Sequence, residues 1–406
     1  MPTVILGGGI IGSSIAYYLS QSQPQEEIHV IESASELFCS ASGYAAGFLA
    51  KDWFAPSLAP LGELSFNLHE SLAAEHGGRQ KWGYMKGVAL SLGSVSNKGG
   101  ARGDDWLRAG TSRAETAAGT SQYGEPQVPE WLTQQQGAKV EQISDKDTTG
   151  QVNEAGTITG VRIVNLNTKS ESTIPCTNLV VCAGPWTPQV FRDLFPFSKV
   201  ALPIYPLAGY SLVLHSPRHT LEHEQKKYHG ETHALFTTWP PSCGFSPELF
   251  SREGREIYIA GLNTKTIPLP ERADDSHNSV DQKEMDRLKA ASVRLLGKLA
   301  EGKTESSDET PNVNDLKIVR EGLCFRPASD RGTPFVGRID DSLLGEGIKT
   351  ATGSRKGGVF VASGHGPWGI SLALGTGKVI ADLVEGVQPA VDISGLGVSS
   401  RGLERI

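Results

Sequence analysis

The chain has 406 residues, of which 38% are hydrophobic and 20% are charged, and its formal net charge is −7. A chain of this length can bury a large core, and we expect it to divide into two domains. Because the balance is acidic and no dense run of Lys or Arg occurs, nucleic acid and anionic membranes are not expected partners. No run of about 18 apolar residues occurs, which predicts no integral membrane segment.

The cysteines and the N-terminus indicate the compartment. The five cysteines are scattered and form no CxxC pair, which predicts neither a disulfide framework nor a metal site. The chain enters an apolar segment almost at once, without the basic n-region of a signal peptide. We therefore expect a cytoplasmic protein.

The first predicted element is a nucleotide-binding turn. Residues 3–20, TVILGGGIIGSSIAYYLS, read as a short apolar strand, a glycine turn and a helix. Gly7 permits a tight turn, Gly9 lets the backbone approach a pyrophosphate, and Gly12 lets the helix pack closely on the sheet. The helix N-terminus then presents free N–H groups to the phosphates. The alternative for such a turn taken alone is a glycine-rich loop without a ligand.

A carboxylate follows at the expected spacing. Residues 27–33, EIHVIES, predict the second strand, and Glu32 lies at its end, where a carboxylate can accept both ribose hydroxyls. An acid there disfavours a 2′-phosphate. The nucleotide is therefore FAD or NAD rather than NADP.

Three further segments favour FAD. Residues 39–50 are a run of small residues, suited to backbone lying along a pyrophosphate and a flavin ring, or to a flexible loop. Residues 178–190 read as a strand, a glycine exit and a helix. Residues 358–386 repeat that pattern, and a second helix N-terminus can stabilise negative charge on a reduced flavin, a role that no nicotinamide requires.

These motifs, taken in order, resemble one family. GGGIIG with Glu32, SASGYAAG, VVCAGPWT, CFRPASDRGTPFVGR and ASGHGPWGISLALGTGKVIADL resemble the FAD-dependent oxidoreductases of the D-amino-acid oxidase superfamily. The segment GYAAGFLAKDWF is most similar to a fungal oxidoreductase branch, which includes a yeast member linked to endosome-to-Golgi traffic.

The resemblance implies an α/β architecture. A Rossmann-like FAD-binding domain, with a parallel sheet and a three-stranded meander, would comprise residues 1–90, 140–200 and 320–406. Residues 91–139 and 201–319 would form a substrate domain of antiparallel sheet, helices and polar loops. Within it we predict strands and one helix from their periodicity, at residues 202–215, 233–239 and 255–263 for the strands and 279–299 for the helix. The polar stretches are predicted as surface loops or disorder, at residues 93–125 and 301–315.

The predicted FAD contacts lie in the glycine turns, the acid and the small-residue run. They are Gly7, Gly9, Ile10, Ile11, Gly12, Glu32, Ser33, Ser40, Ser42, Gly43, Ala46, Gly47, Ala183, Gly184, Trp186, Gly364, His365, Gly366, Gly369 and Ile370.

The predicted catalytic residues are Arg326, His365 and Trp368. The resemblance implies that Arg326, in the frame RPASDRGTP, clamps a substrate carboxylate, for which a guanidinium fork is suited. The alternative is an arginine that braces the domains. His365 and Trp368 are candidates for shaping the flavin edge, although His365 is also placed to cap a helix. Cys324 stands where some relatives attach flavin covalently, while the following residues match the noncovalent type better.

The resulting hypothesis is hydride transfer from the C–N bond of an amino acid or secondary amine to FAD, with oxygen or another acceptor reoxidising the flavin. One alternative is a FAD-binding protein with vestigial chemistry that acts in endosomal or Golgi traffic and is cytoplasmic but peripheral to late endosomes. The other alternative is a NAD-dependent dehydrogenase. One departure from the resemblance stands after residue 152, where a helix and a strand are missing or are replaced by residues 129–143. FAD affinity depends on which of these holds.

Overall fold

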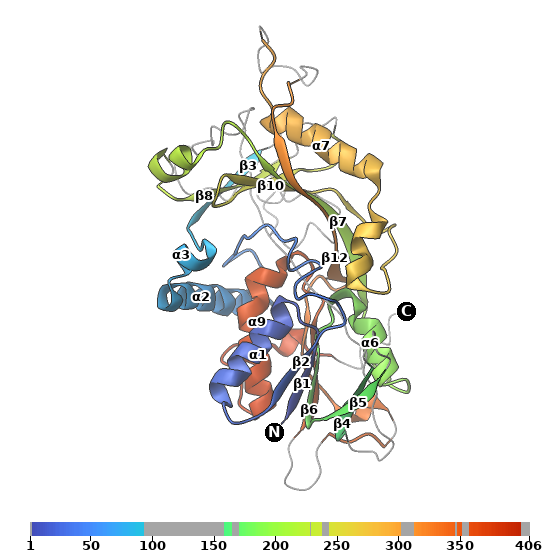
Figure 1. Ribbon diagram of the computed structural model, residues 1–406. Helices are drawn as coiled ribbons and strands as arrows, with labels where there is room; N and C mark the ends of the chain where they lie inside the picture. The colour runs from blue at the N-terminus through green and yellow to red at the C-terminus, as the bar shows by residue number, and fades with distance from the viewer. Residues whose placement is uncertain are drawn as a thin grey trace.

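The computed structural model describes residues 2–92, 158–164, 170–227, 229–237, 243–301, 312–345, 347–350 and 357–398. Within these ranges the chain forms two layered units, each built on one large sheet (Figure 1). The predicted segments 93–125 and 129–143, the departure at residue 152, and residues 302–311 of the polar stretch 301–315 lie outside them.

The lower unit is built on a five-stranded sheet. Its inner strands are fully buried and rich in Val, Ile and Leu, as expected for parallel strands covered on both faces. The edge strand β13 runs antiparallel to β14, and the other neighbours are parallel. In spatial order the strands are β13 (Phe335–Ile339), β14 (Gly358–Ser363), β6 (Asn178–Val181), β1 (Thr3–Leu6) and β2 (Ile28–Ile31).

Helices cover both faces of this sheet (Figure 1). One face is covered by α1 and α9, which pack together, with α2 against α9. The other face carries α6 and the hairpin β4–β5, so the structure describes two strands of the predicted three-stranded meander. The bounds are α1 (Ile10–Ser22), α2 (Ala59–His76), α3 (Gly78–Trp82), β4 (Gly160–Val164), β5 (Glu171–Pro175), α6 (Thr187–Leu194) and α9 (Gly369–Glu385).

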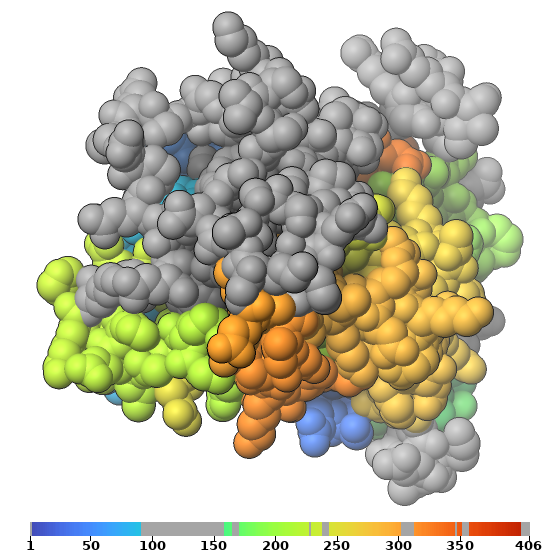
Figure 2. All heavy atoms as spheres, turned by 90° about the horizontal axis from the view of Figure 1, so that it is seen from above, coloured from blue at the N-terminus to red at the C-terminus, as the bar shows by residue number. Residues whose placement is uncertain are grey.

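The upper unit is a seven-stranded sheet backed by α7 (Gln282–Leu296). This helix buries Met285, Leu288 and Leu295, at the spacing that predicted it. Figure 2 shows this end of the molecule from above, with the segment of α7 beside the orange segment in which β12 begins. The strands are β3 (Gly87–Leu92), β7 (Ile204–His215), β8 (Thr232–Thr237), β9 (Glu248–Ser251), β10 (Glu256–Ala260), β11 (Asn263–Thr264) and β12 (Lys317–Ser329).

The predicted fold class is confirmed, but the chain does not change sheets at the predicted positions. Residue 90 falls inside β3, which pairs with β8 of the upper sheet. Similarly, β12 spans residue 320 and pairs along its whole length with β7. Strand pairing of this kind is set by contacts between distant segments, so local sequence does not reveal it. None of the helices in these ranges is long and apolar enough to cross a membrane.

Candidate active site

The first glycine turn is closed by backbone contact. A Cβ at Gly12 would lie 1.9 Å from the carbonyl oxygen of Gly7, so only glycine fits there and α1 packs directly on the end of β1. Gly7 has a φ of +120°, which favours glycine. Both positions therefore require glycine for geometric reasons.

The first turn of α1 contains no carboxylate of its own. Its N-cap, Gly9, has no side chain. The amide of Ile10 donates to Ser42 Oγ at 3.0 Å, which brings the small-residue run to this helix end. A positive helix end beside a hydroxyl is suited to an anion such as a pyrophosphate.

Glu32 is fixed beside the same turn. Its two carboxylate oxygens accept from the amides of Gly8 and Ala34, each at 2.9 Å. Each oxygen can accept more than one hydrogen bond, so the carboxylate retains capacity for ligand hydroxyls. Ser40 is fully buried, and no residue in the described ranges forms a hydrogen bond with its Oγ. A buried hydroxyl without a partner indicates a ligand or ordered water at this point.

The other two glycine turns meet the first at the carboxyl edge of the five-stranded sheet. Ser363 Oγ donates to the carbonyl oxygen of Gly184 at 2.9 Å, joining the ends of β14 and β6. The amide of Cys182 donates to Leu6 O at 2.9 Å, joining β6 to β1. Four segments that are distant in sequence therefore converge here, as predicted from their strand and turn patterns.

Ser371 joins the small-residue segment to α9. Its Oγ donates to Phe48 O at 3.2 Å and accepts from the amide of Ala50 at 3.2 Å. The segment that follows Gly47 thus lies against the start of α9. The sequence did not single out Ser371.

Arg326 lies on β12 and is 94% buried, with a relative exposure of 6%. Its Nη1 donates to Asn263 Oδ1, and Asn263 Nδ2 donates to Gly261 O, which fixes the orientation of the amide. A Cβ at Gly209 would lie 2.8 Å from Arg326 Cζ, so Gly209 makes room for the guanidinium. No carboxylate in the described ranges forms an ion pair with Arg326.

The face of β12 that carries Arg326 meets the small-residue segment. Gly322, Cys324 and Arg326 alternate along the strand and so share one face. Tyr44 packs on Gly322, and Ala41 clusters with Cys324. Arg326 therefore continues a row of residues that covers this segment.

The opposite end of β12 reaches the last glycine turn. A Cβ at Gly364 would lie 3.4 Å from the Cβ of Ser329, and β12 lies against the turns Gly184–Trp186 and Gly366–Trp368. The structure thus brings the predicted carboxylate anchor over the predicted cofactor segments.

His365 and Trp368 are buried in the last turn. His365 Nε2 lies 3.1 Å from Thr376 Oγ1 in α9, and burial lowers the pKa of the imidazole to about 3. Trp368 packs edge-on against Phe54, with ring centroids 4.8 Å apart. His365 is therefore neutral, and both rings contact the body of the fold.

Two other predicted positions have specific surroundings. Trp186 Nε1 donates to Pro270 O at 2.7 Å, which ties the second turn to the segment between β11 and α7. The thiol of Cys324 is buried, and this burial raises its pKa. A thiol held in its protonated form is a poor nucleophile for covalent flavin attachment.

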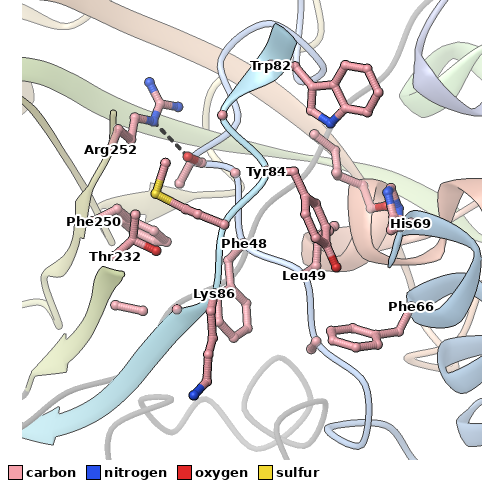
Figure 3. Close-up of a pocket in the computed structure, with 18 of the residues that line it drawn as sticks. Phe48, Leu49, Phe66, His69, Trp82, Tyr84, Lys86, Thr232, Phe250 and Arg252 are labelled. Atoms are coloured by element: carbon pink, nitrogen blue, oxygen red, sulfur yellow. Dashed lines mark hydrogen bonds between the residues drawn. The ribbon is translucent and has the colours of Figure 1, made fainter. Parts of the chain in front are cut away.

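A cavity of about 1130 Å³ opens on the other side of the small-residue segment (Figure 3). It lies between α2 and the strands β3, β8 and β9, and it shares Ile10, Ala46, Gly47 and Ile370 with the predicted cofactor residues. Arg326 does not line it. The aromatic side chains around it include Phe48, Phe66, Trp82, Tyr84 and Phe250.

Sequence reasoning missed the residues that position Arg326. Asn263 and Gly209 stand in ordinary strand sequence, without a motif. Each meets Arg326 only because β11 and β12 both pair with β7. No local signal could have found them.

Comparison with known proteins identifies the family. The profile described as "FAD dependent oxidoreductase" (DAO) matches residues 3–383. The chain belongs to this family. The resemblance predicted from the motifs is thereby confirmed, and the predicted cofactor class agrees with the family's FAD dependence.

The matches extend over nearly the whole chain. "Putative oxidoreductase C1F5.03c" of Schizosaccharomyces pombe is 26% identical, covering 94% of this chain and 93% of that protein. "Putative oxidoreductase TDA3" of Saccharomyces cerevisiae is 21% identical, covering 97% and 93%. Both are yeast proteins, in agreement with the predicted fungal branch.

The fold recurs in a solved structure. The crystal structure of glycine oxidase from Geobacillus kaustophilus has a TM-score of 0.63 at 18% identity, covering 98% of each chain. This similarity establishes the shared fold of the family.

The residues around the turns fit FAD. At this sheet edge the first turn of α1 has no acidic residue, the carboxylate of Glu32 is fixed, and no described residue hydrogen-bonds the Ser40 hydroxyl. They match the pyrophosphate, the ribose and a further polar group of a dinucleotide.

Proposed function

We propose that this chain binds FAD and oxidises the C–N bond of an amino acid, or of a secondary amine that carries a carboxylate. Arg326 binds the carboxylate. The observation that carries the proposal is the surroundings of this guanidinium, which is almost fully buried and has neutral side-chain partners, the amide of Asn263 and the thiol of Cys324.

A buried cation without a counter-ion is costly, since neither water nor an opposite charge compensates its lost hydration. A substrate carboxylate supplies that charge and fits the planar fork of donors. Gly209 makes room for the fork, the Asn263 amide and the Cys324 thiol hydrogen-bond to it, and its remaining N–H groups would bind a ligand. The name of the similar glycine oxidase, which specifies an amino acid, supports the same substrate class.

FAD would be held by the residues predicted from the sequence. The turn at Gly7 and Gly12 and the end of α1 would hold the pyrophosphate, and Glu32 the ribose. The small-residue segment and the turns at residues 183–186 and 364–370 would hold the flavin. The bound flavin supplies the acceptor for the hydride, and oxygen or another acceptor takes the electrons onward.

The remaining work of the chain is binding and orientation. Arg326 fixes one end of the substrate, and β12 covers the site and excludes water. His365 serves as a neutral wall of the flavin site, since its lowered pKa excludes a cation at physiological pH. The amide of Trp368 donates to His365 O at 3.0 Å, and the indole ring packs against Phe54. An amine that enters in its neutral form needs no strong base from the protein.

The test begins with the visible spectrum of the purified protein, before and after denaturation and filtration. A flavin spectrum whose dye passes the filter supports noncovalent FAD, and a colourless protein that free FAD does not restore contradicts the proposal. The loaded enzyme is then assayed on amino acids and on the amines that lack their carboxylate.

The role of Arg326 is tested with Arg326→Lys and Arg326→Ala. Lysine keeps the charge without the fork, so we expect KM for the amino acid to rise about ten-fold with lysine and at least about a hundred-fold with alanine. An unchanged KM in both variants would contradict the assignment.

A further inference from the structure

The small-residue segment is held by side chains of the upper sheet. Residues 43–46 lie outside every helix and strand, yet their backbone oxygens are not left to solvent. Four consecutive carbonyl groups accept hydrogen bonds from three side chains: Gly43 O from Arg320 Nη1 at 2.8 Å, Tyr44 O from Tyr258 Oη at 2.9 Å, Ala45 O from Arg252 Nη2, and Ala46 O from Arg252 Nε at 2.7 Å.

Arg252 is the central member of this carbonyl clamp. It donates to two adjacent carbonyls, and its side chain is 24% exposed. Its guanidinium lies 4.9 Å from the ring centroid of Tyr258 and 3.5 Å from Glu256. Figure 3 shows Arg252 reaching across the wall of the cavity toward the segment. Two charge-assisted bonds from one planar group fix both position and direction.

Tyr258 and Arg320 complete the clamp on either side of it. Tyr258 is buried, and burial raises the pKa of its phenol, which stays a donor at neutral pH. Arg320 stacks over the ring of Tyr44, with its guanidinium 4.8 Å from the centroid, and donates to Gly43 O. The clamp therefore consists of one buried phenol, Tyr258, and two half-buried arginines, Arg252 and Arg320.

The clamp connects the cofactor segment to the strand that carries Arg326. Its three residues stand on or directly beside β9, β10 and β12 of the upper sheet. The segment continues into Phe48 and Ala50, which Ser371 of α9 holds from the lower unit. The distance between the segment and Arg326 is thus set by side chains rather than by backbone pairing.

We propose that Arg252 and Tyr258 are positioning residues that hold residues 43–47 in register with Arg326, so that FAD meets a preformed segment. The part concerning FAD rests on the proposed function. The preformed segment is a property of the chain itself, and it is measurable in the protein without cofactor.

The test compares Arg252→Ala, Arg252→Lys and Tyr258→Phe with the wild type by hydrogen exchange of the amides of residues 43–47 in the cofactor-free protein. The matched control is Arg218→Ala. Arg218 has a similar exposure, 25%, but its partners are Asp315 and the carbonyl oxygen of Leu296 rather than the carbonyl groups of residues 43–46. FAD affinity is then measured by flavin fluorescence.

We expect Arg252→Ala to raise exchange of this segment at least about ten-fold and to weaken FAD binding by a similar factor, since two charge-assisted bonds are lost. Tyr258→Phe, which keeps the ring, is expected to weaken FAD binding about three-fold to ten-fold. In Arg252→Lys we expect the exchange rate and the FAD affinity to lie between those of the wild type and those of Arg252→Ala. Arg218→Ala leaves exchange of residues 43–47 and FAD affinity at wild-type values.

Unchanged exchange in both Arg252→Ala and Tyr258→Phe would overturn the proposal. Should Arg252→Ala fail to fold, Tyr258→Phe and Arg252→Lys decide the matter alone. A wild-type protein that binds no FAD would defeat the proposed function, while the exchange comparison would still test the clamp.

Discussion

The guanidinium of Arg326 donates to the side-chain oxygen of Asn263, and this neutral amide takes the place where a buried arginine commonly has a carboxylate. The pair leaves the positive charge to be compensated by a ligand. Asn263→Asp tests this directly, because it has nearly the same shape and supplies an internal counter-ion.

We expect Asn263→Asp to raise KM for amino acids at least about ten-fold, since the new carboxylate competes with that of the substrate. The melting temperature stays the same or increases. Steady-state kinetics measure the effect, and amines without a carboxylate serve as the control. A KM equal to that of the wild type would show that Arg326 does not bind the carboxylate.

Gly209→Ala is expected to displace the same guanidinium. The added Cβ would lie 2.8 Å from Arg326 Cζ and 2.9 Å from both terminal nitrogens. The expected cost is about 1–3 kcal/mol in the free energy of unfolding, with a rise in KM. Gly397→Ala is the control, because a Cβ there meets nothing within 4 Å. Equal effects of the two substitutions on KM would contradict the contact.

Gly12→Ala reverses the usual helix rule. Alanine within a helix is more stable than glycine by about 1 kcal/mol. Here its Cβ would lie 1.9 Å from Gly7 O, so α1 must move from β1. We expect a lower melting temperature and loss of FAD binding, measured by calorimetry and fluorescence titration. A melting temperature at or above that of the wild type would refute the close packing.

His365 makes stability depend on pH. Burial lowers its pKa from 6.5 to about 3. Between these values the unfolded chain binds a proton that the folded chain does not, so the free energy of unfolding falls as pH is lowered through this window. Above about pH 6.5 the effect is absent. The maximum slope from one such group is about 1.4 kcal/mol per pH unit.

His365→Gln is expected to lose less stability than the wild type between about pH 7.5 and about pH 5, by about 1–2 kcal/mol in urea denaturation. His69, whose pKa burial lowers to about 4, contributes in the same direction and is present in both proteins. Identical losses in the two proteins would mean that His365 is not held neutral.

The predictions from sequence succeeded where the pattern is local. A strand, a glycine turn and a helix are contiguous in the chain, and the roles of Gly7 and Gly12 follow from backbone sterics within six residues. The segments converge because parallel strands place their carboxyl ends at one edge of the sheet.

Local sequence carried no signal for contacts that depend on pairing between distant strands. The partners of Arg326 come from β7 and β11, and the donors to residues 43–46 come from β9, β10 and β12. No spacing in the sequence relates Asn263 to Arg326, or Arg252 to Ala46. The predicted domain boundaries at residues 90 and 320 fall inside strands for the same reason. The cytoplasmic or endosomal location and the trafficking role stay predictions. Reduction of the flavin by amines would distinguish an enzyme from a FAD-binding protein with vestigial chemistry.

The central claim is that bound flavin is reduced by amines that present a carboxylate to Arg326. The most direct measurement is flavin absorbance under anaerobic conditions, after adding an amino acid or the matched amine without its carboxylate, to the wild type and to Arg326→Ala. The account predicts rapid bleaching only for the wild type with the amino acid. Equal bleaching by both compounds, or equal rates in both proteins, would contradict it.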